Sequence, residues 1–291
     1  MADVLSPPRP APARAPRPGR APGLLLRYAL RLFVATYLVL LVAWPVSLVA
    51  INAFDGGVSA VVDTLADPDV RAALRLTVFA AACAVVINTV FGVGMSMLLV
   101  RHRFPGRRAL NALVDLPLSV SPIVVGLALV LVYGGRDGWF GPTLESMGLQ
   151  VIFSTPGIIM ATAFVALPLV IREVAPVLEE IGTDQELAAK SLGASGWQAF
   201  LRITLPGIKW AIVYGVVLTL ARSLGEFGAV KVVSGNVLGE TRTATLVVEE
   251  KYLNFDPQGA YAVAFLLAMV SVVCIVFVAL IRPKQEKGNR R

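Results

Sequence analysis

Long uncharged apolar segments, separated by shorter polar ones, dominate the chain. Five of them span 18 to 25 residues each without a charged side chain, at residues 32–51, 76–100, 116–133, 151–171 and 260–281. A helix rises about 1.5 Å per residue, so about 20 apolar residues cross the ~30 Å hydrocarbon core of a bilayer. The pattern therefore predicts five membrane-spanning helices.

A sixth span is predicted at residues 210–233. Its uncharged part, residues 210–221, is too short to cross a bilayer alone, so the full span must include Arg222, Glu226 and Lys231. We accept it as a span because charged side chains inside a membrane are costly and usually functional.

Arg222 and Glu226 are four residues apart, so on a helix they share one face and can pair. The pair is either a structural ion pair that fixes helix packing or, together with Ser223, part of a path or gate for a charged solute. The sequence leaves both interpretations open.

The basic residues indicate the orientation. Most of the 26 Lys and Arg residues lie on one side of the predicted spans, in the N-terminal segment, residues 101–108, residues 172–209 and the C-terminal tail. The positive-inside rule assigns that side to the cytoplasm, with both termini. We expect a multi-pass, all-α membrane protein with a disordered basic N-terminal arm (residues 1–27), a six-helix domain (residues 28–281) and a basic cytoplasmic tail (residues 282–291).

Composition narrows the function further. The chain is 56% hydrophobic and 15% charged, whereas soluble domains average about 45–50% and about 25%, which argues against a soluble enzyme. The net charge of +7 arises from loop residues and sets membrane orientation, and no nucleic-acid-binding module is visible. With Cys83 and Cys274 in apolar runs and a single histidine, His102, we expect neither a metal site nor histidine-based catalysis.

The longest predicted cytoplasmic connection, residues 172–207, has signals for two short helices. Thr183 and Glu186 fit a capping box that starts a helix over residues 184–192, which Gly193 ends in a left-handed turn. Ser195 and Gln198 repeat the device, and Pro206 is expected to separate the second helix from the next span. The alternative is an ordinary amphipathic loop on the bilayer surface.

The spacing Ala188-Ala189-x3-Gly193-x9-Ile203-x-Leu205-Pro206 resembles the EAA loop of bacterial ABC importer permeases. The resemblance implies the six-helix MetI-like fold and a coupling helix that docks on a separate ATP-hydrolysing subunit. It assigns this role to Glu186, Leu187, Ala188, Ala189, Gly193, Ile203, Leu205 and Pro206. One departure is that the glutamate position of the family falls on Leu187, with Glu186 one place earlier.

The string at residues 221–235 resembles the permeases of oxyanion importers, and it is shared by sulfate and molybdate systems. Three further strings, at residues 115–122, 138–142 and 239–242, are similar to the CysW-type permeases of sulfate/thiosulfate importers. This resemblance implies a transport subunit in the bacterial inner (cytoplasmic) membrane. It also implies three kinds of partner: a second permease (CysT-type, or a second copy), two ATP-binding subunits and an external sulfate-binding protein. Molybdate or a related tetrahedral oxyanion is the alternative substrate.

No phosphate-binding loop of the type G-x-x-x-x-G-K-[ST] occurs in the sequence. We therefore expect no cofactor on this chain and no ATPase activity of its own, with ATP used by the partner. An intramembrane enzyme and a non-transporting scaffold are the competing classes. The first lacks converging acids or histidines, and the second leaves the docking loop unused.

The third span contains Pro117, Ser119, Ser121 and Pro122, which should interrupt its helix. Interrupted spans are tolerated where the freed backbone groups face protein or a water-filled cavity. The hydroxyls of Ser119 and Ser121 can then contact a tetrahedral dianion. Alternatively, the helix is only kinked and its serines bond back to their own carbonyls.

Overall fold

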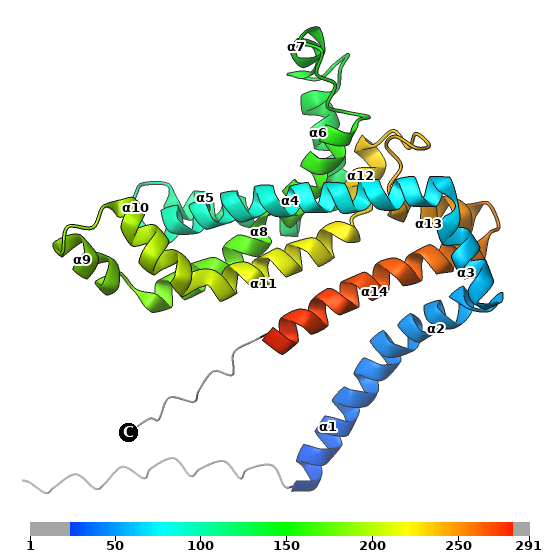
Figure 1. The fold of residues 1–291 in the computed structure, drawn as a ribbon, viewed down its shortest axis with the longest axis horizontal. Helices are drawn as coiled ribbons and strands as arrows, with labels where there is room; N and C mark the ends of the chain where they lie inside the picture. Colours follow the sequence, from blue (N-terminus) through cyan, green and yellow to red (C-terminus); the bar gives the residue numbers. More distant parts are fainter. Residues whose placement is uncertain (1–23, 282–291) are drawn as a thin grey trace, which may run out of the picture. The chain divides into compact units, whose positions relative to one another are not determined.

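The structure is a computed structural model that describes residues 24–281, and all regular secondary structure in that range is helical (Figure 1). The η elements are single π-helical turns within longer helices. In chain order the elements are α1 (Leu24–Leu38), η1 (Val39–Ala43), α2 (Trp44–Ala53), α3 (Gly57–Ala66), α4 (Pro68–Arg101), α5 (Arg107–Ser119), α6 (Pro122–Tyr133), α7 (Gly141–Ser146), α8 (Thr155–Ile181), α9 (Asp184–Ser191), α10 (Gly196–Ala199), η2 (Phe200–Thr204), α11 (Leu205–Leu224), α12 (Gly228–Val233), α13 (Ala244–Leu253) and α14 (Pro257–Ile281).

The described residues fall into two units, residues 24–48 and residues 49–281. The first unit is an apolar helix with a π-helical turn at Val39–Ala43. This turn comes just before Pro45, whose nitrogen has no hydrogen to donate, so an altered hydrogen-bond register is expected there. The N-terminal arm was predicted to be disordered up to residue 27, but residues 24–27 are helical. The rest of the predicted arm, residues 1–23, and the predicted tail, residues 282–291, lie outside the described residues.

The second unit is built around α4, α8 and α11, which pack on one another along their lengths (Figure 1). Val170 of α8 is fully buried between the other two helices. A Cβ atom added at Gly92 of α4 would lie 2.7 Å from the Val170 Cβ, and one added at Gly215 of α11 would lie 2.9 Å from the Val170 Cα. The two glycines thus permit the close approach of three backbones.

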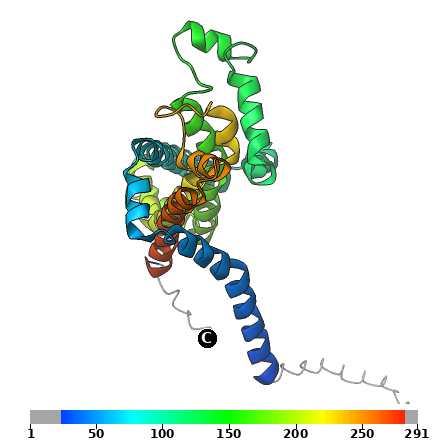
Figure 2. The same cartoon turned by 90° about the vertical axis from the view of Figure 1, so that its right-hand side faces the viewer.

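The number of spans agrees with the prediction. Among the described residues, five helices are long and apolar enough to cross a membrane, and the pair α5 and α6 makes a sixth if it is counted as one broken span. The predicted interruption of the third span is confirmed, because α5 and α6 meet at an angle of 112° across Val120 and Ser121. Figure 2 shows α7 projecting from the group of α4, α8 and α11, whereas Val125 of α6 belongs to the same buried cluster as Ala161 and Val165 of α8.

Several predicted boundaries are wrong. Residues 172–181 continue α8 as helix instead of beginning a loop. Pro206 does not separate two helices, since α10, η2 and α11 run without a break from Gly196 to Leu224. The π-helical turn just before Pro206 shifts the hydrogen-bond register where the proline offers no N–H, and this keeps the helix intact.

The sixth span also differs from its prediction, because its helix ends at Leu224 and does not continue to residue 233. Glu226 lies in the break that follows, and Lys231 lies in the separate short helix α12. Helix α12 packs closely on α6: a Cβ atom at Gly126 would lie 2.8 Å from the Val232 Cβ. This contact positions the two broken helices against each other.

The start of α14 is stabilised by Asp256. Its carboxylate accepts hydrogen bonds from the Gly259 N–H at 2.9 Å and from the Lys251 ammonium at 3.1 Å. Partial burial alone would raise the pKa of Asp256, but these two donors outweigh it and hold the pKa below its usual value of 3.8.

Candidate coupling site and solute path

Helix α9 and the turn that follows it lie at one end of the group formed by α4, α8 and α11, opposite α13 (Figure 1). The predicted helix is confirmed as α9, and Gly193 ends it in the left-handed conformation at φ 88°. The second predicted cap is confirmed as well. The Ser195 hydroxyl accepts the Gln198 N–H at 3.2 Å, and the Gln198 side chain accepts the Ser195 N–H at 2.9 Å.

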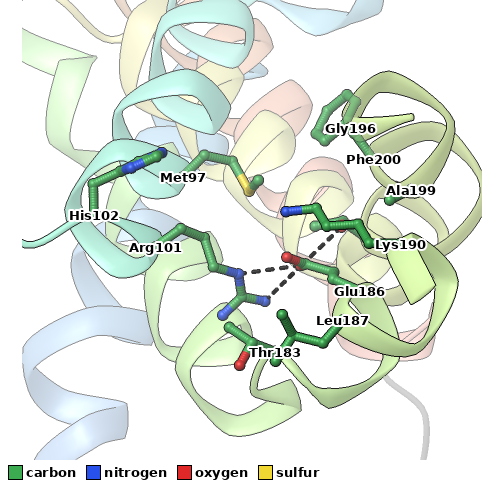
Figure 3. Close-up of a pocket in the computed structure, with 11 residues that line it drawn as sticks. Met97, Arg101, His102, Thr183, Glu186, Leu187, Lys190, Gly196, Ala199 and Phe200 are labelled. Atoms are coloured by element: carbon green, nitrogen blue, oxygen red, sulfur yellow. Dashed lines mark hydrogen bonds and ion pairs between the residues drawn. The ribbon is translucent and has the colours of Figure 1, made fainter. Parts of the chain in front are cut away.

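The first predicted capping box does not form, because Glu186 turns away from Thr183 and binds Arg101 at the end of α4 (Figure 3). One carboxylate oxygen of Glu186 accepts hydrogen bonds from Arg101 Nε at 3.1 Å and Nη2 at 2.9 Å, and from the Thr204 hydroxyl at 2.9 Å. Arg101 Nη1 also donates to the Leu178 carbonyl at 3.0 Å. This cluster joins α4, α8, α9 and η2.

The ion pair is largely buried, with 8% of the Arg101 side chain and 15% of the Glu186 side chain exposed. Beside it lies a cavity of about 310 Å³ between the end of α4 and the α9–η2 segment (Figure 3). His102 and Lys190 contribute to its wall. The carboxylate therefore faces the interior of the protein, where it fixes the position of α9.

The exposed surface of the same segment carries large apolar side chains among polar ones. Leu192 is 90% exposed and Trp197 is 68% exposed, and Ala188 is exposed as well. Leu187 is 55% exposed and also lines the cavity. Large apolar side chains gathered on a short exposed turn are typical of a docking surface. We call Leu187, Ala188, Leu192 and Trp197 the docking surface.

The predicted coupling residues do not all belong to the docking surface. Ala189 is half-buried, and Gly193 forms the turn. Ile203 and Leu205 are half-buried in η2 and α11, and Pro206 is exposed in the continuous helix. Sequence reasoning missed Arg101, Thr204 and Trp197. Only Trp197 had a usable signal, as a large aromatic residue directly after the Ser195 cap.

The two helix breaks, between α5 and α6 and between α11 and α12, lie together. A Cβ atom added at Gly228 would lie 3.0 Å from the Pro122 Cβ. Arg222 and Glu226 form the predicted ion pair next to this contact, with Nη1 and Oε2 2.7 Å apart. The Glu226 side chain is 2% exposed and the Arg222 side chain 38% exposed, so one member is buried and the other partly open.

Glu226 also organises the start of α12. Its second carboxylate oxygen accepts the Ala229 N–H at 3.0 Å, and its backbone carbonyl accepts the Thr245 hydroxyl at 2.8 Å. The pair is therefore structural on the Glu226 side. The guanidinium of Arg222 remains partly accessible to a solute.

The three predicted serines lie in different surroundings. The Ser119 hydroxyl is exposed and donates at 3.4 Å to the Asp115 carbonyl of its own helix, as in the alternative interpretation. Ser121 is exposed at the α5–α6 break without a side-chain capping bond. Ser223 is buried in α11, where its hydroxyl has no hydrogen-bond partner among the described residues.

Comparison with known proteins identifies the family of this chain. The family model described as "Binding-protein-dependent transport system inner membrane component" matches residues 88–287. The chain belongs to this family. This permease is 48% identical over 254 residues to the sulfate transport system permease protein CysW of Synechococcus elongatus. The match covers 87% of this chain and 88% of the relative.

Two relatives from Escherichia coli are also similar. The permease is 42% identical to its sulfate transport system permease protein CysW, over 85% of this chain and 84% of the relative. It is 39% identical over 213 residues to CysT of the same transport system, over 73% of this chain and 76% of the relative.

The fold of the permease matches a solved importer. A chain of the bacterial alginate ABC transporter, crystallised with its alginate pentasaccharide-bound periplasmic protein, superimposes with a TM-score of 0.72 at 19% identity. The match covers 87% of this permease and 92% of that chain. At this identity the match shows the fold alone, and it confirms the predicted importer-permease architecture.

Proposed function

We propose that this permease is the membrane subunit of an ATP-driven importer for sulfate and the related dianion thiosulfate. The observation that supports this best is the identity of 48% and 42% to CysW proteins of two bacteria, over more than four fifths of each chain. Sulfate is favoured over molybdate because the CysW and CysT relatives are both named for sulfate transport.

The assembled importer would contain a second permease, two ATPases and an external binding protein. A CysT-type chain is the favoured second permease, because the 39% identity to Escherichia coli CysT makes the two chains alike enough to pack as a pseudo-symmetric pair. ATP hydrolysis belongs to the separate subunits, and this permease binds no cofactor of its own. The basic residues of the sequence support cytoplasmic termini.

The docking surface would seat α9 in a groove of the ATPase on the cytoplasmic side. Closure of the ATPases on ATP would then displace α9. Because Glu186 is bonded to Arg101 and Thr204, the displacement would be passed to α4 and to the helix that contains η2 and α11. The permease pair would change from inward- to outward-facing in this way.

The two helix breaks are the proposed contact region for the oxyanion. The Arg222–Glu226 pair has no net charge, so it offers hydrogen-bond donors to a dianion without trapping it by full neutralisation. The exposed hydroxyls of Ser119 and Ser121 lie at the same junction. This combination suits a tetrahedral oxyanion that must bind and then leave.

Radiolabelled sulfate uptake into proteoliposomes tests the proposal. They would hold this permease, a CysT-type partner, the ATPase and the binding protein, with thiosulfate and molybdate as competitors. We expect ATP-dependent uptake that thiosulfate blocks and molybdate does not. Molybdate uptake in place of sulfate by a correctly assembled complex would overturn the substrate assignment.

Arg222→Gln tests the proposed contact region, with Arg136→Gln in the exposed segment between α6 and α7 as the matched control. We expect at least a tenfold loss of uptake for the first variant and unchanged uptake for the control. Equal uptake by both variants would exclude Arg222 from the path.

A further inference from the structure

Helix α5 has three distinct faces. Val114 and Leu110 pack with Leu99 and Ile171 in the interior. Leu113, which is 66% exposed, and Leu116, 43% exposed, form an uncovered apolar face. The remaining face carries polar side chains, with Leu118, 46% exposed, at its edge.

The polar face contains Asn111, Asp115 and Ser119, which follow one another at four-residue intervals, and Arg108 lies on the same side. Asn111, Ser119 and Arg108 are exposed, and Asp115 is half-buried. A helix inside a membrane can leave Leu113 and Leu116 against lipid. Its polar face requires water or another protein.

Helix α8 places charged residues along this polar face. Arg172 donates from Nε at 3.1 Å to Asp115 Oδ1, and its Nη2 lies 3.0 Å from the same oxygen. The Asp115 and Arg172 side chains remain 40% and 55% exposed. Closer to the start of α5, Arg107 Nη2 lies 3.8 Å from Glu179 Oε1.

The polar face leads from the start of α5 to the break beside Arg222. Asp115 lies eight residues after Arg107 and so about 12 Å along the helix, and Ser119 adjoins the α5–α6 break. The start of the face opens into a cavity of about 540 Å³, lined in part by Arg108 and Asn111. Polar side chains thus continue from this cavity to the junction of the two broken helices.

The charge of this face favours an anion. Arg107, Arg108 and Arg172 outnumber Asp115 and Glu179, and both carboxylates are already paired. Within residues 24–281, Arg108 belongs to none of the ion pairs, so one positive charge remains exposed beside the cavity.

We propose that the polar face of α5, together with Arg172 of α8, lines the water-filled route by which a divalent tetrahedral oxyanion leaves the helix breaks toward the cytoplasm. The identity of the solute rests on the proposed function, whereas the existence of a wet route does not. Half-exposed charges on α5 and α8 are costly against lipid and acceptable in water.

Thiol labelling of the assembled importer in inside-out membrane vesicles tests the route. In a background with Cys83→Ala and Cys274→Ala, Asn111→Cys or Ser119→Cys places a thiol on the polar face. Leu113→Cys and Leu116→Cys are matched controls, because both positions are exposed but belong to the apolar face.

We expect a membrane-impermeant methanethiosulfonate to label the two polar-face thiols at least tenfold faster than the two controls. Unreactive polar-face thiols would overturn the proposal, because the face would then lie against lipid or a dry permease interface. Equal labelling rates for all four thiols would overturn it as well, because the polar face would then be no wetter than the apolar face. Labelling needs no transport, so it separates failure of the route from failure of the substrate assignment. The same labelling can be repeated with sulfate or molybdate added. If molybdate slows labelling of the polar-face thiols and sulfate does not, the route stands and the proposed substrate is refuted.

The positive charge is tested by Arg108→Gln, with Arg103→Gln as its control. Arg103 is exposed in the same basic connection but precedes α5. We expect a several-fold lower uptake for Arg108→Gln at unchanged complex assembly, and wild-type uptake for the control. Equal uptake by both variants would remove the electrostatic part of the proposal.

Discussion

Replacement of Glu186 by Gln is expected to uncouple ATP hydrolysis from transport. The carboxylate oxygen that accepts two N–H groups of Arg101 and the Thr204 hydroxyl loses its charge, and the new amide brings donors to a site already filled with donors. Removal of one partner from a buried ion pair costs about 3–5 kcal/mol. Because both side chains keep slight exposure, the lower end applies.

A loss of about 3 kcal/mol corresponds to a change of about 150-fold in the equilibrium between the attached and the detached position of α9, since about 1.4 kcal/mol is tenfold. In the reconstituted importer we expect at least a tenfold fall in sulfate uptake. ATP hydrolysis should continue but no longer respond to the loaded binding protein. Arg103→Gln, which removes an exposed neighbouring charge, should leave both measurements unchanged.

The double variant Arg101→Gln with Glu186→Gln decides whether the ion pair is the cause. If the pair positions α9, each single change already breaks it, and the double variant should be little worse than either single one. Effects that add within about 0.5 kcal/mol would mean that the two residues act independently. That result would refute the assignment of Glu186 to an internal contact and would point to direct contact with the ATPase.

Three further outcomes are expected in thermal unfolding of the purified permease. Gly193→Ala should lower stability by about 1–2 kcal/mol because its φ is left-handed, whereas Gly196→Ala, in ordinary helix, should not; equal effects would contradict this. Gly126→Ala should cost about 1–3 kcal/mol through overpacking against α12, and Gly94→Ala, where an added Cβ meets open space, should be neutral or stabilising. Asp256 has a lowered pKa in the fold, so its contribution is present above its unfolded pKa of about 3.8 and is lost as the pH falls through the lower folded value; Asp256→Asn should therefore flatten the acid side of the stability profile.

The apolar runs predicted the existence of the spans but not their ends. An uncharged run measures how much of a helix suits lipid, whereas α8 continues for ten residues after its apolar run. Val174 and Leu178 in that extension are fully buried against α11, while Arg172 and Glu179 face outward. The helical period therefore continues beyond Arg172, and a search for uncharged residues stops too early.

The break in the third span was predictable, and its direction was not. Pro117 and Pro122 indicate where backbone hydrogen bonds are lost. The angle between α5 and α6 is 112° and depends on how closely α6 packs against α12. That packing brings Gly126 of α6 against Val232 of α12, and the two residues are more than a hundred positions apart in the sequence. No local pattern contains that information.

The two capping boxes show why the coupling segment was only partly predictable. Both sequences fit the motif, and Ser195 forms its box because Gln198 has no hydrogen-bond partner outside it among the described residues. Glu186 has a stronger competitor in Arg101, which lies 85 residues earlier and arrives only with tertiary packing. A charge-assisted pair in a nearly dry site outweighs one local cap. Glu186 therefore pairs with the distant Arg101 instead of capping its own helix, and this pair is the contact that joins α9 to α4 and α8.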